Sequence, residues 1–151
     1  MGFDTGVAQS PAPLTFRLLP PDEVADHWSD LGPILRRSTD VTQGEIGSYD
    51  LLQFLNSGMY RLLAVFNGET IIAGLVVRVV TNPHTKQLHA MFLGGTGGFF
   101  WGRDMLDMVE KLARDEGCSK VTFRGRREWA RVLAPFGYEA ASINYEKAVA
   151  S

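Results

Sequence analysis

The sequence predicts an α/β (α+β) fold in which a mixed, mostly antiparallel central sheet is flanked by helices. Three apolar segments in the middle of the chain alternate with short turn sequences, as in an antiparallel meander. Residues 87–126 then read as a strand, a glycine-rich turn, an amphipathic helix and a second strand. A crossover of that length implies that its two strands lie parallel, so the sheet is mixed. The 151 residues, 45% of them hydrophobic, suffice for a sizeable core.

The N-terminal region is expected to hold a loose arm, a strand and helical structure. Residues 1–13 are rich in Gly, Ser, Ala and Pro, which favours a flexible arm ahead of a single domain over 14–151. A segment that orders on a partner is the alternative. Leu14–Leu19 alternates apolar and polar residues, as a strand does, and Pro20-Pro21 ends it. The helix that follows has an acidic first turn, and we expect Gly32-Pro33 to bend or divide it.

A polar segment separates this helix from the next. Residues 36–47 are turn-like, and Thr42 with Glu45 fits a capping box for the second helix. Ser48 or Asp50 would serve equally well as the cap.

The meander comprises Tyr60–Phe66, Thr70–Val80 and Lys86–Leu93. Asn67-Gly68, between its first two strands, is a strong hairpin signal. Asn82-Pro83 turns the chain again before the third strand.

An amphipathic helix is expected from Phe99 or Gly102 to Glu116. Gly117 suits the left-handed position that follows a helix, and Lys120–Phe123 reads as a short strand.

The C-terminal region is predicted to add one helix and one or two strands. Arg127–Ala134 reads as a short helix closed by Pro135. Tyr138–Ala148 supplies one last extended segment or two short ones.

Composition and charge exclude several classes of protein. A formal net charge of −2 argues against broad binding to nucleic acid or to acidic membranes. The most apolar run, Ile71–Val80, is too short to span a bilayer and carries Arg78. The N-terminus lacks a basic region followed by an apolar run, so we expect no signal peptide and a cytoplasmic location, the protein's own or a host's.

Cysteine and histidine chemistry is sparse. The single cysteine, Cys118, excludes an internal disulfide and a cysteine metal cluster, and a buried structural role is favoured over a nucleophile. His27, His84 and His89 have no metal-ligand spacing with carboxylates, so no metal is predicted.

The order of elements resembles that of the GNAT acetyltransferase superfamily, over roughly Leu14 to Lys147. Its local marks are L-H-A-M-F-L-G-G-T, the helix end D-E-G-C, V-T-F-R-G-R-R-E-W and A-P-F-G-Y-E. More narrowly, the chain is similar to the short GNAT-like proteins of tailed bacteriophages. The marks shared with those are Gly44-Glu45, Gly94-Gly95, Trp101, Gly117-Cys118, Gly125, Arg126 and Trp129.

In that superfamily a Q/R-x-x-G-x-G/A loop after the fourth strand binds the pyrophosphate of acetyl-CoA through backbone N–H groups. Here Gly102 matches the second glycine, but Phe100 replaces the first and Gly97 replaces the Gln or Arg. Because a side chain hinders close backbone approach, the usual contact is in doubt. The residues that the resemblance implies for acetyl-CoA are Leu93, Gly94, Gly95, Gly97, Gly98, Gly102 and Arg103. The alternative is that Gly94–Gly98 forms only a flexible turn.

The resemblance also implies acid–base residues. Many members place a tyrosine before the final G-F/Y as general acid, but that slot holds Leu133 or Ala134 here. A general acid is worth about 10²–10⁴-fold, so its absence weakens an enzymatic interpretation without abolishing it. The candidate general bases are His89, in the fourth strand, and Glu45, in the loop between the helices. A satisfied strand histidine and a capping residue are the respective alternatives.

A basic cluster follows the last predicted parallel strand. It consists of Arg124, Arg126, Arg127 and Arg131. This cluster could meet the 3′-phosphate of CoA or an acidic partner surface; the alternative is a solvated face.

Two functional hypotheses follow. The first is an acyl-CoA-dependent N-acyltransferase, phage-encoded, that transfers an acetyl group to an amine. The second is a non-catalytic GNAT-fold protein that binds another protein, as a virion, assembly or host-takeover factor. The altered glycine motif, the missing tyrosine and the aromatic run Phe99–Trp101 motivate the second.

Overall fold

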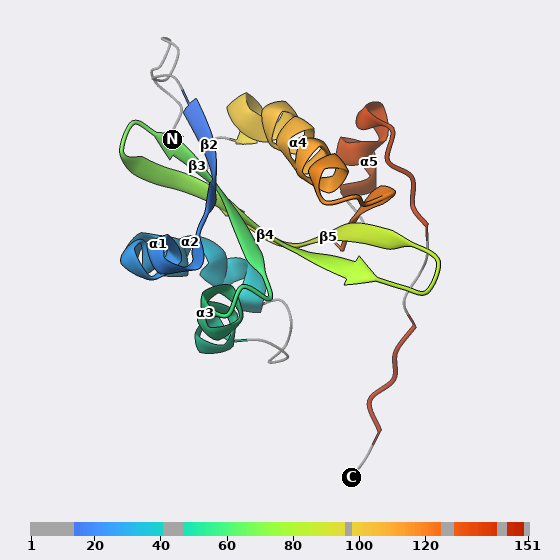
Figure 1. The fold of residues 1–151 in the computed structure, drawn as a ribbon, viewed down its shortest axis with the longest axis horizontal. Helices are drawn as coiled ribbons and strands as arrows, with labels where there is room; N and C mark the ends of the chain where they lie inside the picture. The colour runs from blue at the N-terminus through green and yellow to red at the C-terminus, as the bar shows by residue number, and fades with distance from the viewer. Residues whose placement is uncertain (1–13, 41–46, 96–97, 125–128, 142–144, 150–151) are drawn as a thin grey trace.

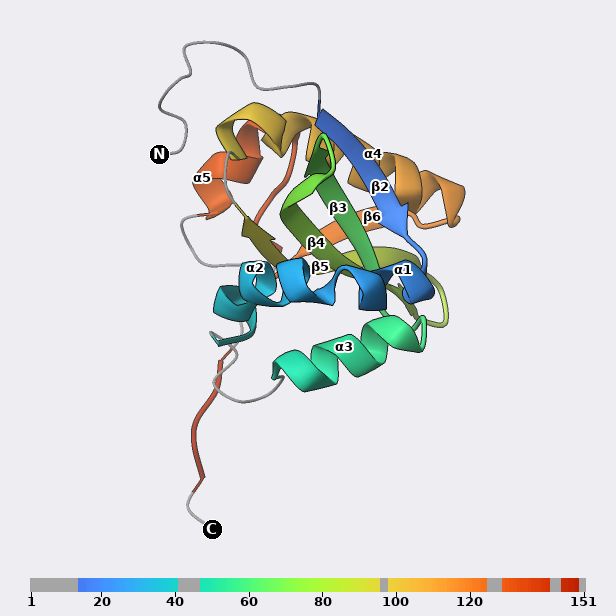
Figure 2. The same cartoon turned by 90° about the vertical axis from the view of Figure 1, so that its left-hand side faces the viewer.

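The structure is a computed structural model that describes residues 14–40, 47–95, 98–124, 129–141 and 145–149. Its centre is a five-stranded sheet in the order β2-β3-β4-β5-β6. The first four strands are antiparallel and β6 is parallel to β5. Figures 1 and 2 show α1, α2 and α3 on one face of the sheet and α4 with α5 on the other. The predicted fold class is therefore confirmed.

The meander forms where the sequence predicts it. Its strands are β3 (Arg61–Asn67), β4 (Thr70–Thr81) and β5 (Lys86–Gly95). Gly68 has φ 66°, so the Asn67-Gly68 turn uses the left-handed conformation that glycine adopts easily. β2 (Leu14–Leu19) pairs with β3 along its whole length and lies at one edge of the sheet.

The helical segment is divided, but not where the sequence predicts. α1 spans Pro21–Asp26 and α2 spans Trp28–Asp40, so the break falls at His27 and Pro33 lies inside α2. The His27 ring packs edge-on against Phe66, 5.8 Å between centroids, which fixes the break by a tertiary contact. Pro33 is exposed. Residues 36–40, predicted to be turn-like, are helical and form the end of α2. Packing of α2 on β4 and β5 overrides their weak helix propensity.

α3 (Ser48–Asn56) starts with a partial capping box. The Gly47 N–H donates to the Asp50 carboxylate at 3.0 Å, which satisfies one of the free N–H groups at the helix start. The N-cap is therefore Gly47, and the prediction of Ser48 or Asp50 as the cap is wrong: the helix starts at Ser48, and Asp50 contributes as its third residue. The other predicted pair, Thr42 and Glu45, lies outside the described residues.

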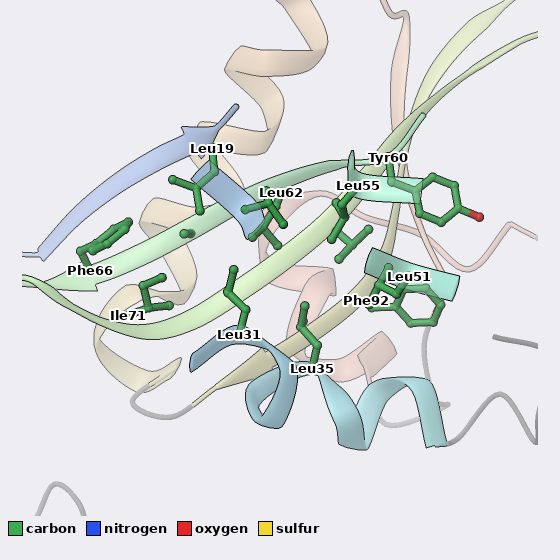
Figure 3. Packing of buried hydrophobic residues seen from close by; sticks show 13 residues of the cluster. Leu19, Leu31, Leu35, Leu51, Leu55, Tyr60, Leu62, Phe66, Ile71 and Phe92 are labelled. Atoms are coloured by element: carbon green, nitrogen blue, oxygen red, sulfur yellow. The ribbon is translucent and has the colours of Figure 1, made fainter. Parts of the chain in front are cut away.

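The core on the side of α1, α2 and α3 is made of leucines and aromatics (Figure 3). Leu31 and Leu35 rise from α2 toward the strands, and Leu62 of β3 is among the side chains that meet them. Each of these leucines is at most 1% exposed, and full burial of such a side chain stabilises by roughly 1.5–3 kcal/mol. This core holds α2 directly on β4 and β5.

The opposite face is covered by α4 (Gly98–Asp115), which starts at the early end of the predicted range. Its buried stripe includes Trp101, Met105 and Val109. Gly117, at φ 77°, ends the helix in the left-handed conformation, as predicted.

The C-terminal region departs from the prediction of a last strand. After β6 (Lys120–Phe123), the described residues form α5 (Trp129–Leu133) and a 3₁₀ turn over Ala134–Phe136. Residues 138–141 and 145–149 are not in a strand, and most of them are exposed. The predicted strand is wrong over these residues because they pair with no neighbouring strand of the sheet.

Candidate functional site

β5 and β6 part half-way along β5. Their parallel pairing runs from Gln87 opposite Lys120 to Ala90 opposite Phe123, and Arg124 N–H donates once more to the Ala90 carbonyl at 3.3 Å. β5 itself continues to Gly95, paired with β4 on its other side. Within the described residues, the second half of β5 therefore has no strand beside it on the β6 side.

A β-bulge marks the point of parting. Val76 of β4 is opposite Phe92, but its neighbour Val77 is opposite Ala90, so Met91 is an extra residue in β5. A bulge bends the strand and shifts the alternation of its side chains. Ala90 accordingly belongs to the core under α4, whereas Met91 and Phe92 both pack with the core under α1–α3.

The two glycines at the end of β5 are required by packing within the fold. A Cβ on Gly94 would overlap the main-chain carbonyl of Ile34 in α2. A Cβ on Gly95 would overlap Ala73 of β4, and Gly95 has φ +135°, which favours glycine. The sequence assigned both to acetyl-CoA; close approach of α2 and β4 is a sufficient reason for each. Their role toward a cofactor, and that of Leu93 beside them, stays a prediction.

The start of α4 is a helix N-terminus, a position at which proteins can bind anions. Gly98 begins this 18-residue helix, whose first-turn N–H groups carry the positive end of the dipole. A Cβ on Gly102 would meet nothing within 4 Å, so the space beside its backbone is open. The guanidinium of Arg103 is exposed and lies 5.8 Å from the centre of the Phe136 ring. Gly97 lies outside the described residues, and nothing is described of the side chain of Phe100.

Trp101 has a structural explanation. Its side chain is 5% exposed and belongs to the core under α4, together with Met105 and Val109. The structure thus accounts for this aromatic without a protein partner.

His89 lies on the sheet face covered by α1, α2 and α3, because it alternates with Ala90 of the opposite core. Its partners across the sheet are Arg78 of β4 and Thr122 of β6. Nδ1 of His89 is 2.8 Å from the Thr122 hydroxyl, which fixes the ring orientation. Burial lowers the pKa of His89, and the charges of Arg78 and Arg124 lower it further, against a smaller opposing effect of Thr122. The ring is therefore neutral at pH 7, as a general base must be.

The second candidate base, Glu45, lies outside the described residues, in the segment between α2 and α3. The Asp50 carboxylate accepts a hydrogen bond at the start of α3, where Glu45 was the alternative capping residue. The role of Glu45 as a general base stays a prediction.

The general-acid slot lacks an acid. Leu133 is buried and Ala134 cannot donate a proton. Tyr138 lies nearby in sequence, but its hydroxyl donates to the Glu110 carboxylate at 2.8 Å and its ring packs edge-on against Phe123. Burial and the Glu110 charge raise the pKa of Tyr138, which makes this hydroxyl a weaker acid. Its described contacts tie the C-terminal region to α4 and β6.

Sequence reasoning missed Arg78 as a site residue. The signal was present as a single charge inside an apolar strand, but only the strand register places it opposite His89. Of the predicted basic cluster, Arg124 and Arg131 are exposed, and Arg126 and Arg127 lie outside the described residues.

In the described ranges, no group of three or more His, Cys, Asp or Glu side chains is arranged to hold a metal ion. The same part of the chain has no helix that is long and apolar enough to cross a membrane.

Solved structures of acetyltransferases share this fold. A GCN5-related N-acetyltransferase from Ralstonia eutropha JMP134 superposes with a TM-score of 0.69 over 92% of this chain and 100% of that chain, at 16% identity. An aminoglycoside acetyltransferase from an uncultured soil metagenomic sample gives 0.69 over 91% and 99%, at 15% identity. A predicted acetyltransferase with acetyl-CoA from Clostridium acetobutylicum gives 0.65 over 90% and 96%, at 13% identity. The chain has the GNAT fold.

Sequence comparison adds little. The chain matches no protein-family model. It is 29% identical over 118 residues to the mitochondrial uncoupling protein 4C of Drosophila melanogaster, a match of 72% of this chain and 34% of that protein. The chain thus spans about a third of the length of that curated relative, and a similarity of this extent establishes no family.

Proposed function

We propose that the protein is an acyl-CoA-dependent N-acyltransferase that transfers an acetyl group to an amine. The observation that carries the proposal is the parting of β5 from β6 at the Met91 bulge, with the neutral His89 beside it and the open start of α4 after it. The GNAT fold supports the proposal, and one structural neighbour is a predicted acetyltransferase with acetyl-CoA. Fold alone does not determine activity, so the site residues bear the weight of the argument.

The residues at the start of α4 fit the pyrophosphate of acetyl-CoA. The open space at Gly102 and the helix dipole suit a phosphate, and Arg103 adds an exposed positive charge. We assign Gly97 and Gly98 to the same group, and the backbone of Leu93 and Gly94 to the pantetheine. Acetyl-CoA supplies an acyl group activated as a thioester.

The chain's own residues would handle the proton. His89 takes a proton from the attacking amine as the N–C bond forms and the C–S bond of the thioester breaks. Thr122 holds the imidazole in place through the 2.8 Å contact to Nδ1, which leaves Nε2 to face the amine. Glu45 is the alternative base. Since neither Leu133 nor Ala134 can act as general acid, the leaving thiolate would be protonated by solvent.

Calorimetric titration of the protein with acetyl-CoA tests the proposal. Wild type is expected to bind, and Arg103→Gln to bind at least about tenfold more weakly, because a charge-assisted hydrogen bond contributes roughly 1.5–3 kcal/mol. Arg114→Gln is the matched control, since Arg114 is exposed in the last turn of the same helix. No heat of binding at millimolar acetyl-CoA would rule out the enzyme. If Arg103→Gln and Arg114→Gln bind acetyl-CoA with equal affinity, the pyrophosphate does not bind at Arg103.

A second candidate is a non-catalytic GNAT-fold protein that binds another protein. The observation that favours it is the missing general acid, together with the exposed apolar side chains of Tyr49 and Met59 at the two ends of α3. Absence of acetyl-CoA binding by a folded protein would favour this candidate. Trp101, one of the three aromatic residues that motivated this candidate, is buried in the core and so offers no surface to a partner.

We also propose an origin and a set of partners for the protein. The narrower sequence similarity supports a phage-encoded protein that acts in the host cytoplasm or in the virion, with no nucleic acid or membrane as partner. Its genomic neighbours would test this: virion or phage-metabolism genes are expected on both sides. A chromosomal neighbourhood without phage genes would contradict it.

A further inference from the structure

Within the part of the chain that the structure describes, Arg78 is a partly buried cation with no ion-pair partner. Its Nε is enclosed by the protein and has no hydrogen-bond partner. The ion pairs Arg17–Glu23, Arg61–Glu116 and Lys111–Asp115 do not involve Arg78. A buried donor without an acceptor costs roughly 1–3 kcal/mol, and more when the group is charged. Such a group in a folded protein calls for an explanation.

Arg78 as a whole is only partly buried. Nε is the atom of its side chain that is both enclosed and without a hydrogen-bond partner. The two Nη groups form a planar fork that matches the two oxygens of a carboxylate. Arginine keeps its charge at every physiological pH, so only a partner can neutralise it.

Arg78 belongs to the same row of side chains as His89. The two residues are directly opposite on antiparallel strands, where Cα atoms lie about 4.5–5.5 Å apart. Thr122 completes the row on β6. Arg78 shares the α1–α3 side of the sheet with His89, because it alternates with Val77 of the opposite core. Among the described residues, the charges that act on His89 are those of Arg78 and Arg124, both positive.

We propose that Arg78 binds a carboxylate on the acyl acceptor, so that the acceptors are small amines that carry a carboxylate, such as amino acids. The inference rests on the proposed function for the presence of the amine. The short distance between the paired strands places the two groups of the acceptor a few atoms apart, with the amine at His89 and the carboxylate at the Nη fork of Arg78. A carboxylate bound there would neutralise the unpaired cation and would raise the pKa of His89 by offsetting a positive neighbour.

The test is an NMR pH titration of the His89 ring in the protein without acetyl-CoA. The probes are N-acetylglycine, which carries the carboxylate, and N-acetylglycinamide, which does not, at equal ionic strength. N-acetylglycine is expected to shift the pKa of His89 upward, toward its ordinary value of 6.5, and the amide to leave it unchanged. In Arg78→Gln the pKa should already be higher without ligand, and N-acetylglycine should have no further effect. Arg114→Gln, which removes the same charge on α4, should respond as wild type does.

Three results would overturn the inference. They are an unchanged His89 titration in wild type with N-acetylglycine, an equal shift in Arg78→Gln, and a shift with inorganic phosphate but not with N-acetylglycine. Arg78→Lys keeps the charge but lacks the fork, so it should bind the carboxylate at least about tenfold more weakly than wild type. The titration needs no turnover, so failure of acyl transfer and failure of the carboxylate site are separate outcomes.

Discussion

At the scale of single residues, His89 decides whether the site can do acid–base chemistry. Its neutral form is favoured by burial and by two arginines, and Thr122 orients it. These features are expected of a general base. A purely structural strand histidine held by one hydrogen bond would make the same contacts. A kinetic measurement separates the two.

We predict that the rate of acetyl transfer rises with pH through the pKa of His89, which is lowered from its usual 6.5, and then reaches a plateau. The sign follows because only the deprotonated ring accepts the proton. Removing a positive neighbour in Arg78→Gln raises the pKa, so the inflection of its pH–rate profile should move to higher pH.

His89→Gln should lower kcat by about 10²-fold or more, the usual contribution of a general base. His84→Gln is the control, because His84 is exposed in the turn between β4 and β5. A pH profile that keeps its inflection in His89→Gln would assign the base elsewhere, with Glu45 the next candidate.

At the scale of elements, the packing of α2 on the end of β5 sets the shape of the site. The carbonyl of Ile34 occupies the place of a Cβ at Gly94, so the helix backbone and the strand are in direct contact. The sequence revealed the glycines but not this reason for them, because the contact joins residues 60 positions apart.

Gly94→Ala should lower the free energy of unfolding by about 1–3 kcal/mol, since the added methyl group forces α2 away from β5. Gly102→Ala is the matched control: its Cβ meets nothing within 4 Å, and alanine favours a helix by roughly 0.8–1.0 kcal/mol over glycine. Chemical denaturation of the two variants measures both effects. If Gly94→Ala leaves the free energy of unfolding unchanged, α2 does not approach the end of β5 this closely.

At the scale of the whole molecule, local patterns predicted most of the fold. Leu14–Leu19 and Lys120–Phe123 were predicted with the bounds that the structure has, because alternation and flanking turn residues define a short strand. The break at His27 was not predictable, since it depends on the ring of Phe66, far away in sequence. The last predicted strand failed over residues 138–141 and 145–149 because a strand needs a neighbour as well as a composition.

The candidate site was predictable in outline only. The sequence pointed to His89 and to the start of α4. It did not point to Arg78, because strand register sets which residues face each other, and a shift of one residue exchanges the two faces. The Met91 bulge between β4 and β5, next to the point where the β5–β6 pairing ends, likewise has no local sequence signal.

In the proposed function, acetyl-CoA binds where β5 leaves β6 and α4 begins. Backbone amide NMR during titration with acetyl-CoA tests it most directly, because each amide reports its own surroundings. We predict chemical-shift changes concentrated in residues 91–95 and 98–103, with little change in α3 (Ser48–Asn56). Changes confined to α3 or to the β2 edge, or none at millimolar acetyl-CoA, would contradict the account.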